Sequence, residues 1–541
     1  MLNSLRHTHK LSHLLNAALL VFIALALLGV SPQFWSDTFI WDNEKLIVFD
    51  HLRLLSTSAR FSEINLARIP SLFPDYAIGQ LASFLSDNIT TQYAIYLFSI
   101  AASQAALLAL VVARITGASN TAILSLIAAF AALASFISPD WSSNISLSLV
   151  PVNHGGNALA VLLALALLLA SIDTKRAPQP KLALFATPPI FILAIISNKI
   201  FIIQAALPAI ATISLFLIKE RFPPRKLQGV KLLTSVTAAS LAGYFLSKEL
   251  RSGCNPPIKL DLDFLSALAT DQLKLHLETP DVGIGILILL SLALIWATPI
   301  KKEENIKESF FRVFATTSIS SNLILAAFIS QNSGPFASNS RYLLSSLLLS
   351  EICFLVGTIK LIKLSPLKKW NRFHRLPEFA LAIAALVAVS PISAYGANSL
   401  STIKNWENPY TRLIQDNTPA STSLLSMYEG EHYLSSRSLK AGTNWKIHVS
   451  QIASNGEPNP WDQGKSEFYQ DQDSKTLRDY GGIIIKDQDV DLARSWYGEA
   501  KSIASDQELG VQLWLYDEKG RARINKRIST PLNYGFKVEC D

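Results

Sequence analysis

The sequence predicts a polytopic α-helical membrane protein that ends in a small soluble α/β domain. Of its 541 residues, 50% are apolar and only 16% are charged, whereas an ordinary soluble domain has about 25% charged residues. About eleven stretches are long and apolar enough to cross a bilayer, which takes about 20 residues. After residue 395 these stretches stop and the composition becomes that of a soluble domain. These three observations define the fold class.

The predicted transmembrane domain covers residues 1–395. Its first span follows Arg6 and Lys10 as a signal peptide would. No Ala-x-Ala cleavage site follows Val30, so we interpret this span as an uncleaved anchor. The eleven predicted spans are residues 14–30, 92–112, 121–138, 157–172, 182–196, 200–218, 231–246, 282–297, 311–330, 342–359 and 379–395.

The distribution of Lys and Arg predicts the orientation of these spans. Short cytoplasmic loops retain basic residues and translocated loops avoid them. With the N-terminus inside, the inner loops hold most of the basic residues, and the outer loop 139–156 holds none. An odd number of spans then places the C-terminus outside. The net charge of +7 divides into +10 for the membrane part and −3 for residues 396–541. The basic excess therefore indicates membrane topology and argues against a nucleic-acid partner.

Residues 396–541 are expected to form the extracytoplasmic domain. Three short β-like runs alternate there with a helix-like run at 492–505, which predicts a small α/β unit. The β-like runs are residues 445–449, 482–485 and 511–516. The three cysteines are scattered and form no CxxC pair, so the sequence contains no cysteine-based zinc or redox motif. Cys254 and Cys540 both fall outside in this topology, which makes a disulfide between them chemically possible.

Two outer loops, 31–91 and 247–281, are long, and long irregular loops are usually functional. The first carries Asp37, Asp42 and Glu44 just after span one, among aromatic residues typical of the membrane interface. Acids beside an apolar surface tend to have raised pKa values, which suits a general base acting on a hydroxyl. The alternative is that these three acids are ordinary solvated loop residues.

The same loop contains Arg68 and Asp75 in a proline-bordered segment. Pro70 and Pro74 disfavour helix at the preceding residue, which predicts an ordered turn before an amphipathic segment at 76–85. Arg68 is a candidate for binding a phosphate oxygen. Asp75 is a candidate for the substrate site or, alternatively, for capping the segment that follows.

Four other residues lie at predicted outer ends of spans. The sequence predicts substrate or phosphate binding for each of them: His154, Lys199, Arg341 and Tyr342. The alternatives are interfacial hydrogen bonding for the histidine, snorkelling for the lysine and headgroup anchoring for the arginine. Motifs for nucleotide binding, zinc proteases and serine hydrolases are absent, and the inner loops are short. Any catalytic site is therefore expected outside or within the bilayer.

The arrangement resembles the GT-C superfamily of polytopic glycosyltransferases. The resemblance lies in the overall topology, in the acids Asp37, Asp42 and Glu44 of the first loop, and in the segments around Arg68, Lys199 and Arg341. It implies a polyprenyl-phosphate-linked sugar as donor, a glycan or lipid as acceptor, and transfer with inversion. A carboxylate, Asp42 or Asp37, would be the base, and the cationic side chains would hold the phosphate. No cofactor is expected, with a divalent metal left open, and the expected location is a bacterial inner membrane.

Two other function classes fit the same topology. A transporter or flippase for a lipid-linked sugar would also need intramembrane charge, and Glu351 near the middle of the tenth span favours it. A non-catalytic membrane assembly protein would act through residues 396–541.

Overall fold

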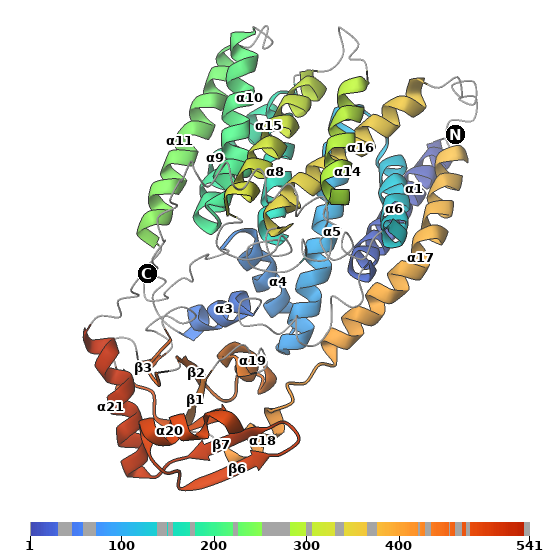
Figure 1. Ribbon diagram of the computed structural model, residues 1–541. Coiled ribbons are helices and arrows are strands. Elements are labelled where there is room, and N and C mark those ends of the chain that lie inside the picture. The colour runs from blue at the N-terminus through green and yellow to red at the C-terminus, as the bar shows by residue number, and fades with distance from the viewer. Residues whose placement is uncertain are drawn as a thin grey trace.

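The computed structural model describes most of the chain, and its ribbon is shown in Figure 1. The described residues are 2–30, 46–57, 72–137, 149, 155–173, 179–219, 226–250, 282–298, 306–329, 340–364, 376–419, 422–427, 434–453, 455–459, 468–471 and 476–534. The predicted Cys254–Cys540 pair and nearly all of the loop 247–281 lie outside them. Helices fill one part of the molecule, and a small domain containing a β-sheet lies at one end of the helical bundle (Figure 1).

Each of the eleven predicted spans overlaps a helix of the bundle, and the span predicted at 200–218 is divided between η4 and α10. Within the described residues, six helices are long and apolar enough to cross a membrane, and four shorter helices are also apolar. The chain is therefore a multi-pass membrane protein, while the number of crossings and the orientation stay predictions. The helices are α1 (Leu2–Gly29), α5 (Ile89–Thr116), α6 (Asn120–Ile137), α8 (Gly155–Ser171), α9 (Gln179–Ser197), η4 (Ile202–Ala206), α10 (Leu207–Ile218), α11 (Lys226–Leu250), α14 (Val282–Ala297), α15 (Ile306–Ile329), α16 (Ser340–Leu364) and α17 (Leu376–Lys404).

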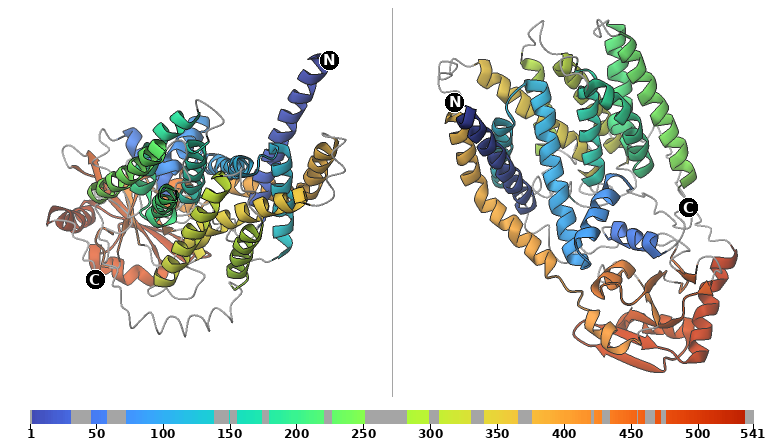
Figure 2. Two further views of the ribbon diagram at one scale, coloured as in Figure 1. Left: turned by 90° about the horizontal axis from the view of Figure 1, so that it is seen from above. Right: turned by 180° about the vertical axis from the view of Figure 1, so that it is seen from behind.

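The first and last helices of the bundle, α1 and α17, lie side by side (Figure 2). Two glycines make this contact close. A Cβ on Gly29 would lie 2.0 Å from the Ile392 carbonyl oxygen, and a Cβ on Gly396 would lie 1.8 Å from the Leu25 carbonyl oxygen. Small residues allow helix backbones to approach in this way within membranes.

The chain passes from the bundle into the domain along α17, which continues past residue 395 to Lys404. Three short helices lie between bundle and domain (Figure 1): α3 (Ile47–Thr57), η3 (Leu72–Tyr76) and α4 (Ala77–Leu85). Helix α4 coincides with the predicted amphipathic segment. The end of the bundle beside these helices is called the domain-facing end below.

The C-terminal domain is an α/β unit, as predicted. Its five-stranded sheet has the order β2-β1-β5-β7-β6, in which β2, β1 and β5 are parallel while β7 and β6 are antiparallel to their neighbours. The strands are β1 (Ser423–Met427), β2 (Val449–Ile452), β5 (Tyr480–Lys486), β6 (Ser502–Asp506) and β7 (Val511–Leu515), with a separate pair β3 (Tyr469–Asp471) and β4 (Thr476–Leu477). The helices are α18 (Thr411–Asn417), α19 (Ser436–Gly442), α20 (Val490–Tyr497) and α21 (Glu518–Tyr534).

Two predicted elements of this domain are wrong in extent. The β-like run expected at 445–449 overlaps β2 only at Val449, because the residues before it form turns. The helix expected at 492–505 ends at Tyr497, because Gly498 adopts a φ of 81°, outside the helical region. The following residues form β6, which pairs with β7 along its whole length. Backbone pairing with β7 prevails over the helical pattern of the sequence.

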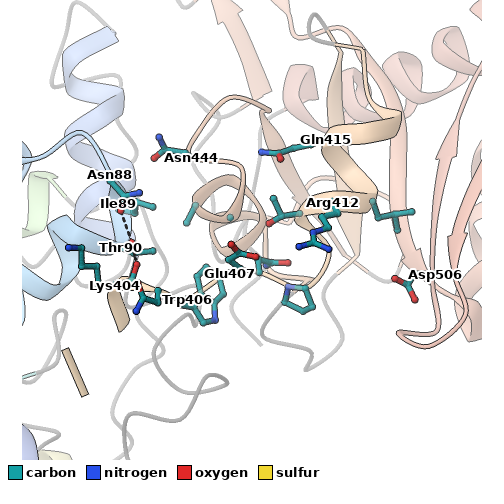
Figure 3. Close-up of a pocket in the computed structure, with 17 residues that line it drawn as sticks. Asn88, Ile89, Thr90, Lys404, Trp406, Glu407, Arg412, Gln415, Asn444 and Asp506 are labelled. Atoms are coloured by element: carbon teal, nitrogen blue, oxygen red, sulfur yellow. Dashed lines mark hydrogen bonds between the residues drawn. The ribbon is translucent and has the colours of Figure 1, made fainter. Parts of the chain in front are cut away.

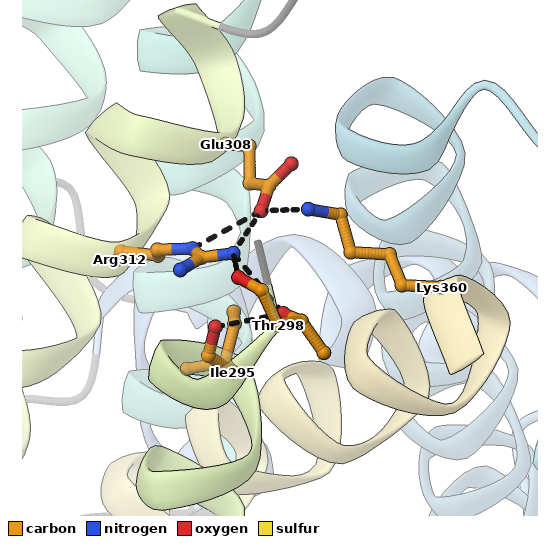
Figure 4. Close-up of polar contacts among 5 residues, drawn as sticks. All are labelled: Ile295, Thr298, Glu308, Arg312 and Lys360. Atoms are coloured by element: carbon orange, nitrogen blue, oxygen red, sulfur yellow. Dashed lines mark hydrogen bonds and ion pairs between the residues drawn. The ribbon is translucent and has the colours of Figure 1, made fainter. Parts of the chain in front are cut away.

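A buried ionic cluster lies at the other end of the bundle, near the end of α8, where the neighbouring Lys307 pairs with Asp173. Figure 4 shows the contacts within this cluster. Glu308 of α15 accepts hydrogen bonds from Arg312 one turn later and from Lys360 of α16. The Arg312 guanidinium also donates to the Thr298 carbonyl oxygen at 2.7 Å. The cluster joins α15 to α16 and to the segment that follows α14.

Candidate active site

The candidate site is built around Asp75 at the domain-facing end. Pro74 keeps Phe73 extended, with φ −130° and ψ 133°, so η3 forms the turn that the prolines predict. The Phe73 amide donates to Ser197 Oγ at 2.6 Å, which fixes this turn to the end of α9. The turn places Asp75 inside the protein, where its side chain is only 2% exposed.

Asp75 does not cap the helix that follows. The N-cap of α4 is Tyr76, and no side chain makes a capping hydrogen bond there. The carboxylate instead accepts a hydrogen bond from the hydroxyl of Tyr96 in α5. Capping is wrong because the turn directs the carboxylate inward, toward α5 and α8.

The carboxylate also lies directly against the first turn of α8. A Cβ on Gly156 would be 2.2 Å from Asp75 Oδ2, so only glycine fits at this position. A helix N-terminus carries a partial positive charge, which favours a carboxylate beside it. The segment 154–156, singled out from the sequence for His154, contributes its glycine to the described site.

Burial raises the pKa of Asp75 to about 7, although the Tyr96 hydrogen bond opposes this shift. At neutral pH the carboxyl group is therefore present in both its protonated and its ionised forms. A carboxylate with this pKa can accept a proton from a hydroxyl group and release it again near pH 7. Strongly raised pKa values of this kind are concentrated at functional sites.

A second acid, Asp50 of α3, lies near Asp75 but has a different environment. Lys440 Nζ of α19 lies 2.8 Å from both Asp50 carboxylate oxygens, and Arg437 Nε lies 3.1 Å from Oδ2. Burial opposes ionisation of Asp50, yet these two cations hold its pKa well below the usual range. This buried cluster fixes the C-terminal domain to the first-loop helix α3.

The next residue, His51, connects this cluster to the turn of the site. Its Nδ1 forms a hydrogen bond of 2.5 Å with the hydroxyl of Tyr76, the neighbour of Asp75. Burial, together with the charge of Arg437, lowers the pKa of His51 to about 3. The imidazole is therefore neutral near pH 7, and a continuous set of contacts joins α19 to the Asp75 turn.

A separate polar network begins at Asn157, the residue after Gly156, and extends into the bundle. Asn157, next to Gly156, donates to Gln204 Oε1 in η4, and Ser345 of α16 donates to the same oxygen at 2.9 Å. Ser318 of α15 donates to the Gln204 carbonyl oxygen. The Asn157 Oδ1 atom is buried without a hydrogen-bond partner among the described residues. Single π-helical turns such as η4 are frequent at functional sites.

The structure describes only part of the site that the sequence predicts. Lys199 lies in the turn between α9 and η4, and its Nζ is 5.9 Å from the centre of the Tyr244 ring. Arg341 and Tyr342 lie in the first turn of α16. The remaining predicted residues lie outside the described ranges: Asp37, Asp42, Glu44, Arg68 and His154.

Several residues of the site are not among those that the sequence predicted. They are Asp50, His51, Tyr96, Gly156, Gln204, Arg437 and Lys440. An adjacent Asp50–His51 pair in an otherwise apolar run was the one available signal. Among the described residues, no three His, Cys, Asp or Glu side chains come together as metal ligands.

No family profile matches this chain, and neither does any curated protein. Among solved structures, the chain is similar to ArnT from Cupriavidus metallidurans in the apo state, with a TM-score of 0.47 and 11% identity over 87% of this chain and 93% of that one. ArnT bound to undecaprenyl phosphate gives a TM-score of 0.46 and 11% identity, over 92% and 98% of the two chains. An oligosaccharyltransferase from Archaeoglobus fulgidus, in complex with zinc and sulfate, gives 0.40 and 13%, over 87% and 68%.

Proposed function

We propose that this chain is a membrane glycosyltransferase of the GT-C type. It moves a sugar from a polyprenyl-phosphate donor to a glycan or lipid acceptor at the extracytoplasmic face of a membrane, with inversion. The observation that supports this proposal best is Asp75, a buried carboxylate with a pKa near 7 at the domain-facing end of the bundle. Its position among helix ends suits a donor whose phosphate lies at the membrane surface.

In the proposed reaction, a first-loop carboxylate removes the proton of the acceptor hydroxyl. The hydroxyl oxygen forms a bond to the anomeric carbon as the bond from that carbon to the phosphate oxygen breaks, and the proton stays on the carboxylate. Polyprenyl phosphate leaves with the bonding electrons. Attack opposite the leaving group inverts the configuration.

We add Asp75 to the first-loop acids that the sequence predicts as candidate bases, Asp37, Asp42 and Glu44. Asp75 is the base that we prefer, because its pKa matches a proton transfer near neutral pH. Arg68, Lys199 and Arg341 are proposed to hold the leaving phosphate, with His154 and Tyr342 beside it. Cationic groups positioned where charge develops stabilise the transition state.

The test is a transfer assay with the purified protein in lipid nanodiscs. Radiolabelled polyprenyl-phosphate sugars are offered one at a time, and release of the label is measured for the wild type and for Asp37→Asn, Asp42→Asn, Glu44→Gln and Asp75→Asn. The control is Asp87→Asn, an exposed acid at the end of the same loop. We expect transfer that requires Asp75. Full transfer by Asp75→Asn, with loss in the Asp42 or Asp37 variant, would assign the base to that acid instead.

A transporter for a lipid-linked sugar is the second candidate, and Glu351 of α16 favours it. This half-buried acid forms no hydrogen bond or ion pair with another described residue of the bundle. An unpaired acid within a membrane helix is typical of a transport pathway. Glu351→Gln would abolish movement of a labelled lipid-linked sugar across proteoliposomes if the chain is a transporter, and would leave transfer unchanged if it is a transferase.

A further inference from the structure

A polar cavity of about 920 Å³ lies where the bundle meets the C-terminal domain (Figure 3). Its walls come from the start of α5, the end of α17 with the segment leading through α18, and the end of α19. Asp506 of β6 lines it from the sheet. Ligand-binding pockets usually measure about 300–1,000 Å³.

The walls of the cavity are fixed by hydrogen bonds. Thr90 of α5 donates to the Lys404 carbonyl oxygen at 2.8 Å, which joins the start of α5 to the end of α17. Asn408 donates to Ser438 Oγ of α19 at 3.1 Å. Asn88 caps α5 by accepting a hydrogen bond from the Thr91 amide. A ligand would therefore meet a preformed surface made of both parts of the molecule.

The chemistry of the lining favours an uncharged, hydroxyl-rich ligand. Lys404, Glu407 and Arg412 are exposed in the cavity, and none pairs through its side chain with another described residue. Gln415 adds an amide, and the hydroxyl of Thr411 is buried without a described hydrogen-bond partner. Acids, bases and amides together offer both donors and acceptors, as the hydroxyl groups of a sugar require.

The mixture of signs argues against a polyanion. A phosphate-rich ligand would meet the carboxylates of Glu407 and Asp506 in the same cavity. An apolar ligand would leave the charged groups without partners. An uncharged glycan is not repelled by these carboxylates, and its hydroxyl groups can form hydrogen bonds with the charged groups.

The cavity is distinct from the Asp75 site but is packed against it. Ile89, Trp406 and Ala441 line the cavity and belong to one buried apolar cluster. The same cluster contains Tyr96, the hydrogen-bond partner of Asp75. A ligand held in the cavity would therefore have a fixed position relative to the carboxylate.

We propose that this cavity binds an uncharged glycan, as the part of the acceptor that is remote from the reacting hydroxyl. Binding energy from a remote part of a substrate can be used to position its reactive part. The role as acceptor site rests on the proposed function, whereas glycan binding itself does not.

The test is direct binding to the full-length protein in lipid nanodiscs, because maltoside and glucoside detergents would themselves present sugars. The probes are fluorescently labelled maltohexaose, cellohexaose, chitohexaose and mannohexaose, with polyphosphate as an anionic probe. The variant is Glu407→Ala/Arg412→Ala. The matched control is Glu518→Ala/Lys519→Ala, which removes the same two charges from exposed positions of α21.

We expect at least one neutral oligosaccharide to bind the wild type and the control equally, and to bind the cavity variant about tenfold or more weakly. Equal binding of every neutral probe to the wild type and the cavity variant would overturn the proposal. So would binding of polyphosphate alone through Glu407 and Arg412.

These measurements also separate the cavity from the proposed function. Binding is measured without donor, so Asp75→Asn should lose transfer and keep the affinity for glycan. A chain that binds glycan through the cavity but transfers no sugar would refute the transferase and leave the cavity proposal standing. If the chain transfers sugar but binds no glycan in the cavity, the cavity proposal is wrong and the transferase proposal stands.

Discussion

Asp75 and Glu308 are both carboxylates with 2% exposure, yet they lie near opposite ends of α8 and have opposite surroundings. Glu308 contacts two cations, Arg312 and Lys360. Asp75 contacts the hydroxyl of Tyr96 and no described cation. A buried charge with cations beside it stays ionised and joins helices, whereas a buried carboxylate without them can gain and lose a proton.

Asp50 allows a closer comparison, because it lies near Asp75. Its neighbour in the sequence, His51, forms a hydrogen bond with Tyr76, the residue after Asp75. Its two cations hold its pKa low, while burial raises the pKa of Asp75. Depth of burial is the same for both acids. The presence of cations therefore decides which acid has a structural role and which has a pKa suited to proton transfer.

The largest expected effect is on transfer in Asp75→Asn. If Asp75 is the base, the rate falls by about 10²–10⁴-fold, because an amide cannot accept the proton. The fold should be retained, since the Asn side chain can still accept the Tyr96 hydrogen bond. Transfer rates and unfolding of the same preparation measure both properties. If Asp75→Asn is unfolded to an extent that accounts for its lower transfer rate, then Asp75 has a structural role, as Glu308 does, and the proposed difference between the two acids is wrong.

Glu308→Gln should mainly affect stability. It leaves the buried Arg312 guanidinium without the Glu308 carboxylate, which costs about 3–5 kcal/mol of unfolding free energy. Denaturant unfolding in detergent micelles measures this change.

A matched variant replaces Glu308, Arg312 and Lys360 together by Met. We expect its stability to lie close to that of the wild type, since removing a whole buried ionic cluster is often neutral. A triple variant as unstable as Glu308→Gln would show that the ionic contacts themselves are required.

The pH dependence of stability should also distinguish the two kinds of acid. Because the folded-state pKa of Asp75 is about 7 and its ordinary value is 3.8, the folded protein binds more protons between these pH values. Its contribution is therefore most favourable below about pH 4 and declines as the pH rises to about 7, by about 4 kcal/mol in total. Asp75→Asn should abolish this decline, measured as the difference between the two unfolding curves across that range.

Asp50 should show the opposite sign. Its folded-state pKa lies below the ordinary value, so its stabilising contribution is complete at neutral pH. That contribution is lost only as the pH falls below about 4. A decline between pH 4 and 7 that persists in Asp75→Asn would come from another group and would contradict the assignment.

The smallest expected effect belongs to Tyr96→Phe. The Tyr96 hydroxyl lowers the pKa of Asp75 by hydrogen bonding, so its removal should raise that pKa further. The acid limb of the pH–rate profile should therefore shift to higher pH, by about one pH unit or less. Tyr93→Phe is the control, because Tyr93 is equally buried one turn earlier in α5. An unchanged acid limb would show that Asp75 does not set it.

Much of the fold could be predicted because membrane helices leave strong local signals. A helix in hydrocarbon satisfies its backbone hydrogen bonds within itself, so a continuous apolar run is sufficient evidence for it. The α/β character of residues 396–541 was also predictable from short alternating runs. The end of α20 was not, because pairing with β7 converts the following residues into a strand.

The sequence by itself determined the local turns at the ends of helices, including the turn at Asp75 and the turn at Lys199. Pro74 and the apolar runs on either side are local features, and their effects are local. Only the tertiary structure decided what each acid does. The cations of Asp50 come from residues 387 and 390 positions later in the chain, and the partner of Asp75 comes from a different helix. The pKa of a buried acid depends on neighbours in space, and these neighbours are brought together only by folding.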